Sequence, residues 1–209
     1  MKPFLIFGAG GHAKAVIEAA RASNNAPDLI ADDDPRASSF LGVPVLAAND
    51  IDKLPNGFRF VVAIGNCATR KEKFQWLCDL GGEPETIIHP RACVSSLSQI
   101  GAGTVIFPMA TIDPCVSIGE NSIINIGAVV GHDCRIGNHC HVSANAALGG
   151  GAVVEDCAWI SLGASVQEGT TIGEGAFIAM GAMISRDVPA HHKAISPHRR
   201  EAAILPIHV

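Results

Sequence analysis

Branched aliphatic residues recur at every sixth position through much of the chain. The register is unbroken over seventeen positions, which are Ile88, Val94, Ile100, Ile106, Ile112, Ile118, Ile124, Val130, Ile136, Val142, Leu148, Val154, Ile160, Val166, Ile172, Ile178 and Ile184. From Val94 onward a small or compact residue stands two positions before each of them, as at Ala92, Ser98, Thr104, Ala110, Cys134, Cys140, Ala146, Ala164, Thr170 and Ala182. A period of six fits neither an α-helix nor the alternation of a simple strand. It is typical of a parallel β-helix built from hexapeptide repeats.

One hexad cannot bury its aliphatic side chain alone, so we expect the coils to stack and the aliphatic side chains to form a ladder inside a prism. Glycines directly follow several core positions, namely Gly101, Gly119, Gly137, Gly149 and Gly173. We expect tight corners there, with unusual backbone angles. Cys134 and Cys140 occupy the small-residue position and are therefore expected to be packing residues.

The first part of the chain begins with a strand, a glycine turn and a helix. The apolar run over residues 4–7 ends in Gly8-Ala9-Gly10-Gly11-His12. Apolar residues then follow at helical spacing over 13–23. A short strand, a turn rich in glycine and an amphipathic segment are what this order predicts.

Two further apolar runs follow before the repeats begin. Residues 29–31 lead into Asp32-Asp33-Asp34-Pro35, and residues 60–64 end at Gly65 and Asn66, before a helical stretch over about 69–80. The order predicts a β-α-β unit with a further βα unit. We therefore expect a small parallel sheet.

The glycine turn predicts a nucleotide site. Glycines let the backbone approach a ligand closely, and the N-terminus of the next helix offers unpaired N–H groups to an anion. An acidic residue after the second strand can accept hydrogen bonds from a ribose or a base. Gly10, Gly11, His12, Asp32 and Asp33 are therefore candidate substrate-binding residues.

A nicotinamide-dependent enzyme is the first alternative, because Gly8, Gly10 and Ala13 fit the GxGxxA form of the dinucleotide fingerprint. Only about 85 residues precede the repeats, whereas a full dinucleotide fold needs two mononucleotide halves. One half is present, which suits a single nucleotide, such as that of a nucleotide-linked sugar. A second alternative is that the glycines only make a tight turn.

Composition and charge narrow the class of protein. The chain has 209 residues, 48% hydrophobic content and a formal net charge of −5, which suits two modest domains. The mildly acidic chain has no basic run, which argues against nucleic acid as a partner. No apolar stretch reaches membrane-spanning length and no signal peptide precedes the first strand, so we expect a cytoplasmic protein without membrane insertion. Seven cysteines without a CxxC pair indicate reduced thiols.

The two parts together resemble the bacterial PglD/NeuD-type sugar acyltransferases. The resemblance is carried by Phe7-Gly8-Ala9-Gly10-Gly11-His12, the Asp32-Asp33-Asp34 turn, Ala63-Ile64-Gly65-Asn66 with Arg70, and Gly131-His132-Asp133-Cys134 within the repeats. It implies a Rossmann-like nucleotide-sugar-binding α/β half-fold over 1–85, a three-sided left-handed β-helix of somewhat more than five coils over 86–188, and a tail over 189–209. Gly65 joins the substrate-binding residues on the same basis.

The resemblance also implies an activity and an assembly. The family acts as homotrimers that hold acetyl-coenzyme A between neighbouring prisms. Its members N-acetylate the 4-amino group of a nucleotide-linked deoxy amino sugar for surface glycans. We favour a UDP-linked sugar for this chain.

The chemistry asks for a base, because an amine that attacks a thioester has to lose a proton. Imidazole exchanges protons near neutral pH. His132 lies two residues past the core position Val130, so it is expected to point outward. The resemblance implies that His132 is the general base and that Asp133 orients it, as the carboxylate of a catalytic triad does. A structural histidine is the alternative.

His139 and His141 raise the question of a metal, because three imidazoles with an open position can hold zinc. Nothing else in the sequence supports zinc, and we expect no metal requirement. The resemblance implies that His141 contacts the acetyl group or the cofactor, and we interpret His139 as a surface residue. It also places Gly150 against the pantetheine arm and Asn125 near the sugar amine.

The end of the chain departs from the family pattern. Relatives finish with glycine-x-proline-alanine and a basic residue, where this chain has Ala194-Ile195-Ser196-Pro197-His198-Arg199-Arg200. Arg199 and Arg200 can pair with the phosphates of the coenzyme, or they are solvated tail charges.

Several functional alternatives stay open at this point. The sugar can be linked to GDP or dTDP, or the acceptor can be a hydroxyl group of a sialic acid or another sugar. A non-catalytic nucleotide-sugar-binding protein is the remaining class. Loop side chains choose the base, the sugar and the acceptor atom on a common fold, so the repeats do not decide among them.

Overall fold

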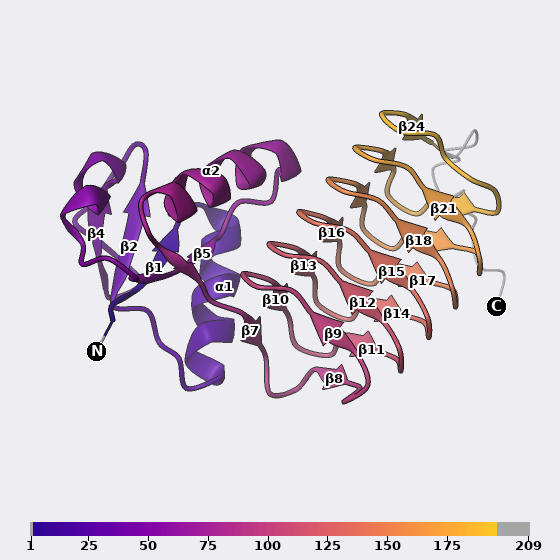
Figure 1. The fold of residues 1–209 in the computed structure, drawn as a ribbon, viewed down its shortest axis with the longest axis horizontal. Helices are drawn as coiled ribbons and strands as arrows, with labels where there is room; N and C mark the ends of the chain where they lie inside the picture. Colours follow the sequence, from indigo (N-terminus) through magenta and orange to yellow (C-terminus); the bar gives the residue numbers. More distant parts are fainter. Residues whose placement is uncertain (1, 196–209) are drawn as a thin grey trace, which may run out of the picture.

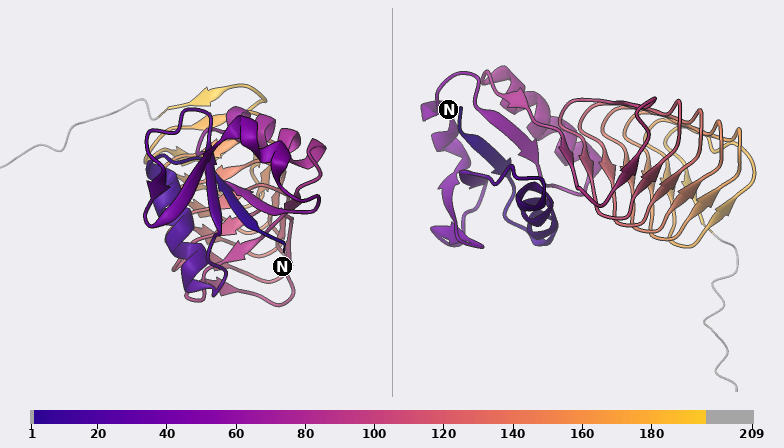
Figure 2. Two further views of the ribbon diagram at one scale, coloured as in Figure 1. Left: turned by 90° about the vertical axis from the view of Figure 1, so that its left-hand side faces the viewer. Right: turned by 90° about the horizontal axis from the view of Figure 1, so that it is seen from below.

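The computed structural model describes residues 2–195 of the chain. Its two parts lie end to end, with an N-terminal α/β unit at one end of a long prism of stacked coils (Figure 1). Figure 2 shows the prism from below and along its length, with helix α1 (Gly11–Ala22) and helix α2 (Cys67–Asp79) next to its first coils.

The α/β unit is built on one six-stranded sheet in the order β3-β4-β2-β1-β5-β6. Its strands are β1 (Phe4–Phe7), β2 (Leu29–Asp32), β3 (Ser39–Phe40), β4 (Val43–Ala47), β5 (Arg59–Val62) and β6 (Glu83–Pro84). All neighbours are parallel except β3 and β4. A 3₁₀ helix, η1 (Ala48–Lys53), follows β4.

The predicted β-α-β unit and the further βα unit are confirmed, while β3, β4, η1 and β6 were not predicted. The prolines at Pro44 and Pro84 interrupt the strand pattern there, since proline is confined to special positions of a sheet. Helix α2 begins before the predicted position 69, because Asn66 caps it. The Asn66 Oδ1 accepts a hydrogen bond from the Thr69 N–H at 3.0 Å.

The prism has three flat sides, which we number in chain order. The first side contains β7 (Ile87–Ile88), β10 (Val105–Ile106), β13 (Ile123–Ile124), β16 (His141–Val142), β19 (Trp159–Ile160), β22 (Phe177–Ile178) and β24 (Lys193–Ala194). The second contains β8 (Cys93–Val94), β11 (Thr111–Ile112), β14 (Val129–Val130), β17 (Ala147–Leu148), β20 (Ser165–Val166) and β23 (Met183–Ile184). The third contains β9 (Gln99–Ile100), β12 (Ser117–Ile118), β15 (Arg135–Ile136), β18 (Val153–Val154) and β21 (Thr171–Ile172).

The aliphatic ladder forms the core of the prism as predicted. Partners in the ladder are three hexads apart, as in Ile106 with Ile124. The aliphatic residues from Ile106 to Ile178 are all buried, and so are Ala110, Cys134 and Cys140 in the small-residue position. Ile88 is 40% exposed, because it lies in the first coil, which has a neighbour on one side only. All seven cysteines are free thiols.

The prediction for the corner glycines was wrong. Gly101, Gly119, Gly137, Gly149 and Gly173 do not have a left-handed backbone. They are needed because the next coil passes close by, and a Cβ at Gly119 would lie 2.6 Å from the backbone carbon of Gly137. In the hexads from Ile100 to Ile178 the left-handed residue is instead the third after the aliphatic residue, as at Asp133, His139 and Gly151.

The last coil is shorter than the others, which explains why the six-residue pattern stops at Ile184. Ile178 pairs with Ala194 and Ile172 with Val188, so the spacing drops from 18 to 16 residues. The β-helix therefore continues to Ala194, beyond the boundary predicted at residue 188. The six-residue pattern did not predict this coil, because its strands still pair with the coil before it although its residues no longer follow the hexad spacing.

The α/β unit is fastened to the first side of the prism. Outward residues of the first coils, Ile87, Val105 and Ile123, belong to one buried cluster with Phe4 and Val16. Farther along the same side, the outward residues are His141, Trp159 and Phe177. The junction therefore ends close to His141, one of the candidate site residues.

Candidate active site

His132 and Asp133 lie in the corner between the second and third sides, where they follow β14 and Gly131. The His132 Nδ1 is 2.8 Å from the Asp133 Oδ2, and the two side chains are 68% and 66% exposed. An ionised carboxylate can only accept, so Nδ1 carries the hydrogen, and in the neutral form of the ring Nε2 keeps its lone pair. Asp133 has a left-handed φ of 60°, which sets its side chain beside the imidazole. The predicted outward orientation of His132 is confirmed.

Gly150 lies on the next coil beneath this imidazole. The Gly151 N–H donates to the His132 carbonyl at 2.8 Å, which aligns the two corners. A Cβ at Gly150 would be 2.6 Å from the His132 Nε2. The absence of a side chain at Gly150 therefore makes room for the imidazole.

His141 lies at the junction of the two domains, with Gly65 and Asn125. Its Nδ1 is 3.2 Å from the Gly65 carbonyl and its Nε2 is 3.4 Å from the Asn125 Nδ2. The ring stacks on Trp159, with centroids 5.2 Å apart and planes at 12°. Burial, assisted by the charge of Arg70, lowers the pKa of His141 to about 3. This histidine is therefore neutral near pH 7.

His12 packs against the same group from the first turn of α1. Its ring centroid is 6.1 Å from that of His141 and 5.6 Å from that of Phe107. Its Nε2 is buried and has no hydrogen-bond partner among residues 2–195. Burial, followed by the charge of Arg70, lowers the pKa of His12 to about 4. The structure thus brings four candidate residues together: His12, Gly65, Asn125 and His141.

His139 is not a surface residue, and this prediction was wrong. Its side chain is buried, and its Nδ1 accepts a hydrogen bond from the Asn121 Nδ2 at 2.9 Å. Phe74 of α2 packs against the ring. The hexad register alone could not predict this burial, because α2 is the element that covers this corner.

The two groups of site residues lie at opposite ends of the second side. Asn125 directly follows β13 of the first side, and His132 is the second residue after β14 of the second side. The width of the prism side therefore separates them within one chain. His132, Asp133 and Gly150 form one half of a site, and Asn125, His141, Gly65 and His12 form another.

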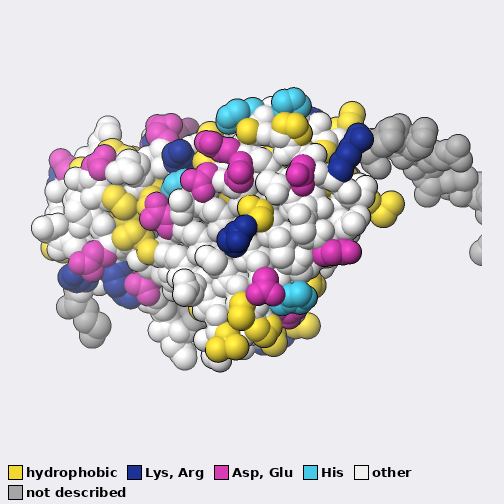
Figure 3. Space-filling view, turned by 45° about the vertical axis from the view of Figure 1, so that its right-hand side comes forward, with side chains coloured by type: hydrophobic (Ala, Val, Ile, Leu, Met, Phe, Trp, Pro, Cys, Tyr) yellow, Lys and Arg dark blue, Asp and Glu magenta, His cyan; other side chains and the backbone are white. Residues whose placement is uncertain are grey.

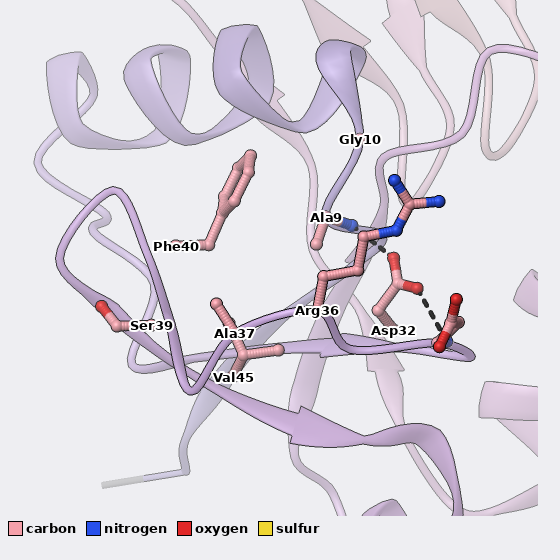
Figure 4. A pocket seen from close by; sticks show the side chains of 9 residues that line it. Ala9, Gly10, Asp32, Arg36, Ala37, Ser39, Phe40 and Val45 are labelled. Atoms are coloured by element: carbon pink, nitrogen blue, oxygen red, sulfur yellow. Dashed lines mark hydrogen bonds between the residues drawn. The ribbon is translucent and has the colours of Figure 1, made fainter.

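A separate cavity of about 370 Å³ opens beside the glycine turn of the α/β unit. Its lining residues come from the turn after β1, from β2, β3 and β4, and from the loop between β2 and β3: Ala9, Gly10, Asp32, Asp34, Arg36, Ala37, Ser39, Phe40 and Val45. Figure 4 shows Phe40 and Val45 on the apolar part of the cavity and the Arg36 guanidinium near Gly10. A Cβ at Gly10 or Gly11 would meet nothing within 4 Å, so the turn is open to a ligand.

The structure separates the roles of the neighbouring aspartates. The Asp32 Oδ2 accepts from the Ala9 N–H at 2.7 Å and its Oδ1 accepts from the Asp34 N–H at 2.9 Å (Figure 4). Asp33 does not line the cavity, because its carboxylate is paired with Lys73 of α2 at 2.8 Å. The sequence alone predicts the same role for Asp32 and Asp33, because it does not show which carboxylate in the turn faces the cavity. Arg36 lines the cavity but was not predicted.

Several further expectations concern metals, membranes and nucleic acids. Among residues 2–195 no three His, Cys, Asp or Glu side chains come together as metal ligands. In that same part of the chain, no helix has both the length and the apolar character needed to cross a membrane.

On the face in Figure 3, Lys and Arg side chains are scattered among acidic ones. Arg199 and Arg200 lie outside the described residues.

Acid is expected to destabilise the fold through the buried histidines. His139 and His141 have folded-state pKa values of about 4 and about 3, below the ordinary value of 6.5. The unfolded chain therefore binds more protons as the pH falls below 6.5, and stability that is full above this pH is lost towards pH 4 and below. At pH 5 each histidine should cost about 2 kcal/mol in the free energy of unfolding. In urea titrations at pH 7.5 and pH 5, His139→Gln should lose less stability between the two pH values than the wild type. An equal loss would contradict this account.

Comparisons with known proteins agree with this architecture. Residues 4–77 match the model of the PglD N-terminal domain, and residues 115–150 match the bacterial transferase hexapeptide model. No curated protein sequence matches the chain. Among solved structures, a variant of perosamine N-acetyltransferase from Caulobacter crescentus, in complex with CoA and GDP-perosamine, is 36% identical. The match covers 93% of each chain with a TM-score of 0.88.

Two other solved structures extend the comparison. The acetyltransferase domain of PglB from Neisseria gonorrhoeae, in complex with acetyl coenzyme A, is 31% identical over 92% of this chain and 95% of that chain, with a TM-score of 0.84. WeeI from Acinetobacter baumannii is 25% identical over 93% and 96%, with a TM-score of 0.87. The predicted fold, an α/β half-fold before a left-handed β-helix, is confirmed. The chain belongs to the PglD-like family of hexapeptide-repeat sugar acyltransferases.

Proposed function

We propose that this acyltransferase moves the acetyl group of acetyl-coenzyme A to an amino group of a nucleotide-linked amino sugar. The observation that carries the proposal is the His132–Asp133 pair, whose Nδ1–Oδ2 bond leaves Nε2 free on an exposed corner. The similar protein from Caulobacter crescentus binds CoA and GDP-perosamine, which supports the same classes of substrate. The finer part of the proposal is the 4-amino group of a UDP-linked deoxy sugar, in the cytoplasm.

The residues at this corner can carry out the proton transfers. The amine nitrogen attacks the thioester carbonyl while the His132 Nε2 takes its proton, and Asp133 stabilises the imidazolium that forms. When the carbon–sulfur bond breaks, the imidazolium returns the proton to the thiolate. The products are the acetamido sugar and free coenzyme A. No other reactant is needed, because the acid and the base are the same residue.

We propose a homotrimer in which the two halves of the site meet between neighbouring chains. The outward residues of the second side carry no charge: Cys93, Thr111, Val129, Ala147, Ser165 and Met183. Exposed apolar side chains also follow the corner between the first and second sides, at Met109, Ile126, Leu162 and Met180. Such a surface favours association with identical chains. The second side separates Asn125 from His132 in one chain, so a neighbour is needed to complete the site.

The cavity beside Gly10 is the proposed nucleotide site. Its apolar part suits a base, and the guanidinium of Arg36 suits a diphosphate, to which arginine forms forked hydrogen bonds. Acetyl-coenzyme A would bind elsewhere, against Gly150 and His141. The donor and the acceptor therefore use different residues.

Arg36→Met is expected to raise the KM for the nucleotide sugar by about 10- to 100-fold, since a charge-assisted hydrogen bond is worth about 1.5–3 kcal/mol. The KM for acetyl-coenzyme A should stay within about twofold of the wild-type value. Asp33→Ala serves as the comparison, because the Asp33 carboxylate faces Lys73 and should have the smaller effect. Initial rates with each substrate varied in turn decide the matter. A larger effect of Asp33→Ala, or an equal rise in the KM for acetyl-coenzyme A, would contradict this assignment.

The experiment that tests the proposed function is an acceptor panel. Purified protein is incubated with acetyl-coenzyme A and amino sugars linked to UDP, GDP or dTDP, together with a sialic acid and NAD. Release of the coenzyme thiol and NMR of the product identify the acceptor atom. N-acetylation of a nucleotide sugar supports the proposal, and the preferred nucleotide decides its finer part. Acetylation of hydroxyl groups alone, tight binding of NAD, or no thiol release with any acceptor would overturn it.

A further inference from the structure

A fully buried arginine lies at the junction of the two domains, and the proton transfers described above do not use it. Arg70 of α2 is 0% exposed, and within residues 2–195 its guanidinium donates only to backbone carbonyls. Within the α/β unit it bonds Ile64 at 3.0 Å and Gly65 at 2.9 Å. None of the ion pairs formed by residues 2–195 includes Arg70. Burying an arginine without a carboxylate costs free energy, because the charge loses its hydration. The five hydrogen bonds of Arg70 have to offset this desolvation.

The other three bonds of Arg70 reach the β-helix. Its Nε donates to the Asn121 carbonyl at 2.9 Å, and its Nη2 donates to the carbonyls of His139 and Cys140 at 2.6 and 3.0 Å. Asn121 returns a bond from its Nδ2 to the Arg70 carbonyl at 3.2 Å. The planar fork of a guanidinium can serve these carbonyls from both domains, whereas a lysine ammonium has only three donors. Arg70 therefore fixes the turn at Gly65 against the coil that carries His141.

The Gly65 carbonyl connects Arg70 to His141. It accepts from the Arg70 Nη1 at 2.9 Å and lies 3.2 Å from the His141 Nδ1. A carbonyl can only accept, so the His141 Nδ1 must carry the hydrogen and Nε2 must be the acceptor. The Asn125 Nδ2 then donates to this Nε2 over 3.4 Å, a long bond that a substrate N–H can replace.

The charge of Arg70 works in the same direction as its hydrogen bonds. After burial it is the largest influence that lowers the pKa values of His12, His139 and His141. His12 also lowers the pKa of His141, and the Gly65 carbonyl raises it. A neutral imidazole at position 141 is the result near pH 7.

We propose that Arg70 is a positioning residue of the acyl-transfer site, which holds the Gly65 carbonyl so that His141 presents an unprotonated Nε2 beside Asn125. This inference rests on the proposed function. It refines the role of His141, because an acceptor nitrogen recognises an N–H or O–H group of a substrate and not the carbonyl oxygen of the thioester. Arg70 itself does not touch a substrate and acts through Gly65.

The tautomer of His141 is the measurement that separates this role from a purely structural one. Two-bond ¹H–¹⁵N correlation spectra of histidine-labelled protein, with His141→Gln for assignment, show which ring nitrogen is protonated. In the wild type at pH 7 without substrates, we expect protonated Nδ1. In Arg70→Lys and Arg70→Met, a population with protonated Nε2 should appear, and kcat should fall at least tenfold. Arg59→Lys is the matched control, because Arg59 pairs with Asn25 and Glu85 and not with the carbonyls that Arg70 holds. It should keep the wild-type spectrum and a kcat within twofold.

Each possible outcome decides the inference. Protonated Nε2 of His141 in the wild type overturns it. Where neither Arg70 variant folds, the wild-type tautomer alone decides, and protonated Nδ1 supports the inference. A folded variant that keeps either the wild-type tautomer or a kcat within twofold also overturns it. The spectra need no substrate, so a wild type that acetylates no amino sugar would refute the proposed function and leave the tautomer result to be judged by itself.

Discussion

His132→Ala is expected to lower kcat for acetyl transfer by about 10²- to 10⁴-fold, the usual contribution of a general base. His132 is 68% exposed and its side chain lies outside the aliphatic core, so the fold and the assembly should be unchanged. The KM for acetyl-coenzyme A should also change little, since His141 and Gly150 are untouched. Steady-state rates with the best acceptor, together with light scattering and thermal unfolding, measure all three effects.

Two variants serve as controls for His132→Ala. Asp133→Asn keeps the shape of the side chain but removes the charge that stabilises the imidazolium, so its loss should be real but smaller. His191→Ala removes an exposed histidine from another corner and should have the wild-type rate. The general-base assignment fails if folded His132→Ala works within about twofold of the wild type, which corresponds to only ~0.4 kcal/mol of transition-state stabilisation.

Gly150→Ala should reduce kcat at least tenfold, although it adds a single methyl group. That methyl group would lie 2.6 Å from the His132 Nε2 and would push the imidazole out of its place. Gly150 does not have a left-handed backbone, so an alanine fits the main chain. The exposed imidazole can move away, and the melting temperature should therefore stay near that of the wild type. Kinetics and thermal unfolding of the same preparation test both statements.

A double-mutant cycle shows whether Gly150 acts through His132. In the His132→Ala background, Gly150→Ala should have little further effect on kcat, because no imidazole is left to displace. A remaining rise in the KM for acetyl-coenzyme A would measure a direct contact of Gly150 with the pantetheine arm. Equal losses of kcat in the two backgrounds would contradict a role through His132.

The six-residue period predicted the prism because the repeat itself is the structural unit. Each aliphatic residue from Ile106 to Ile178 is buried where its register places it. The period could not predict the shortened last coil, where Val188 and Ala194 pair after the register is lost. The period also could not distinguish two kinds of corner position. Some need a left-handed backbone, as at Asp133, and others need a residue without a side chain because the next coil lies close by, as at Gly119.

The site was predictable where it depends on local order and not where it depends on contacts between distant segments. His132 and Asp133 are adjacent in the sequence, so their pairing followed from the motif. The burial of His139 and the bonds of Arg70 depend on how α2 meets the coils, which no local pattern encodes. The separation of Asn125 from His132 depends on how the chain winds around the prism, which places the second side between them.

We propose that acetyl transfer takes place between two chains, one of which supplies His132 and the other Asn125 and His141. Hybrid trimers of His132→Ala and His141→Gln chains test it most directly. Each variant alone should be nearly inactive. Trimers formed by unfolding and refolding an equal mixture should regain activity, because about one quarter of the sites would combine an intact His132 with an intact His141 from the neighbouring chain. A mixture that refolds to trimers and stays as inactive as its components would contradict a shared site, and so would a fully active wild-type monomer in light scattering.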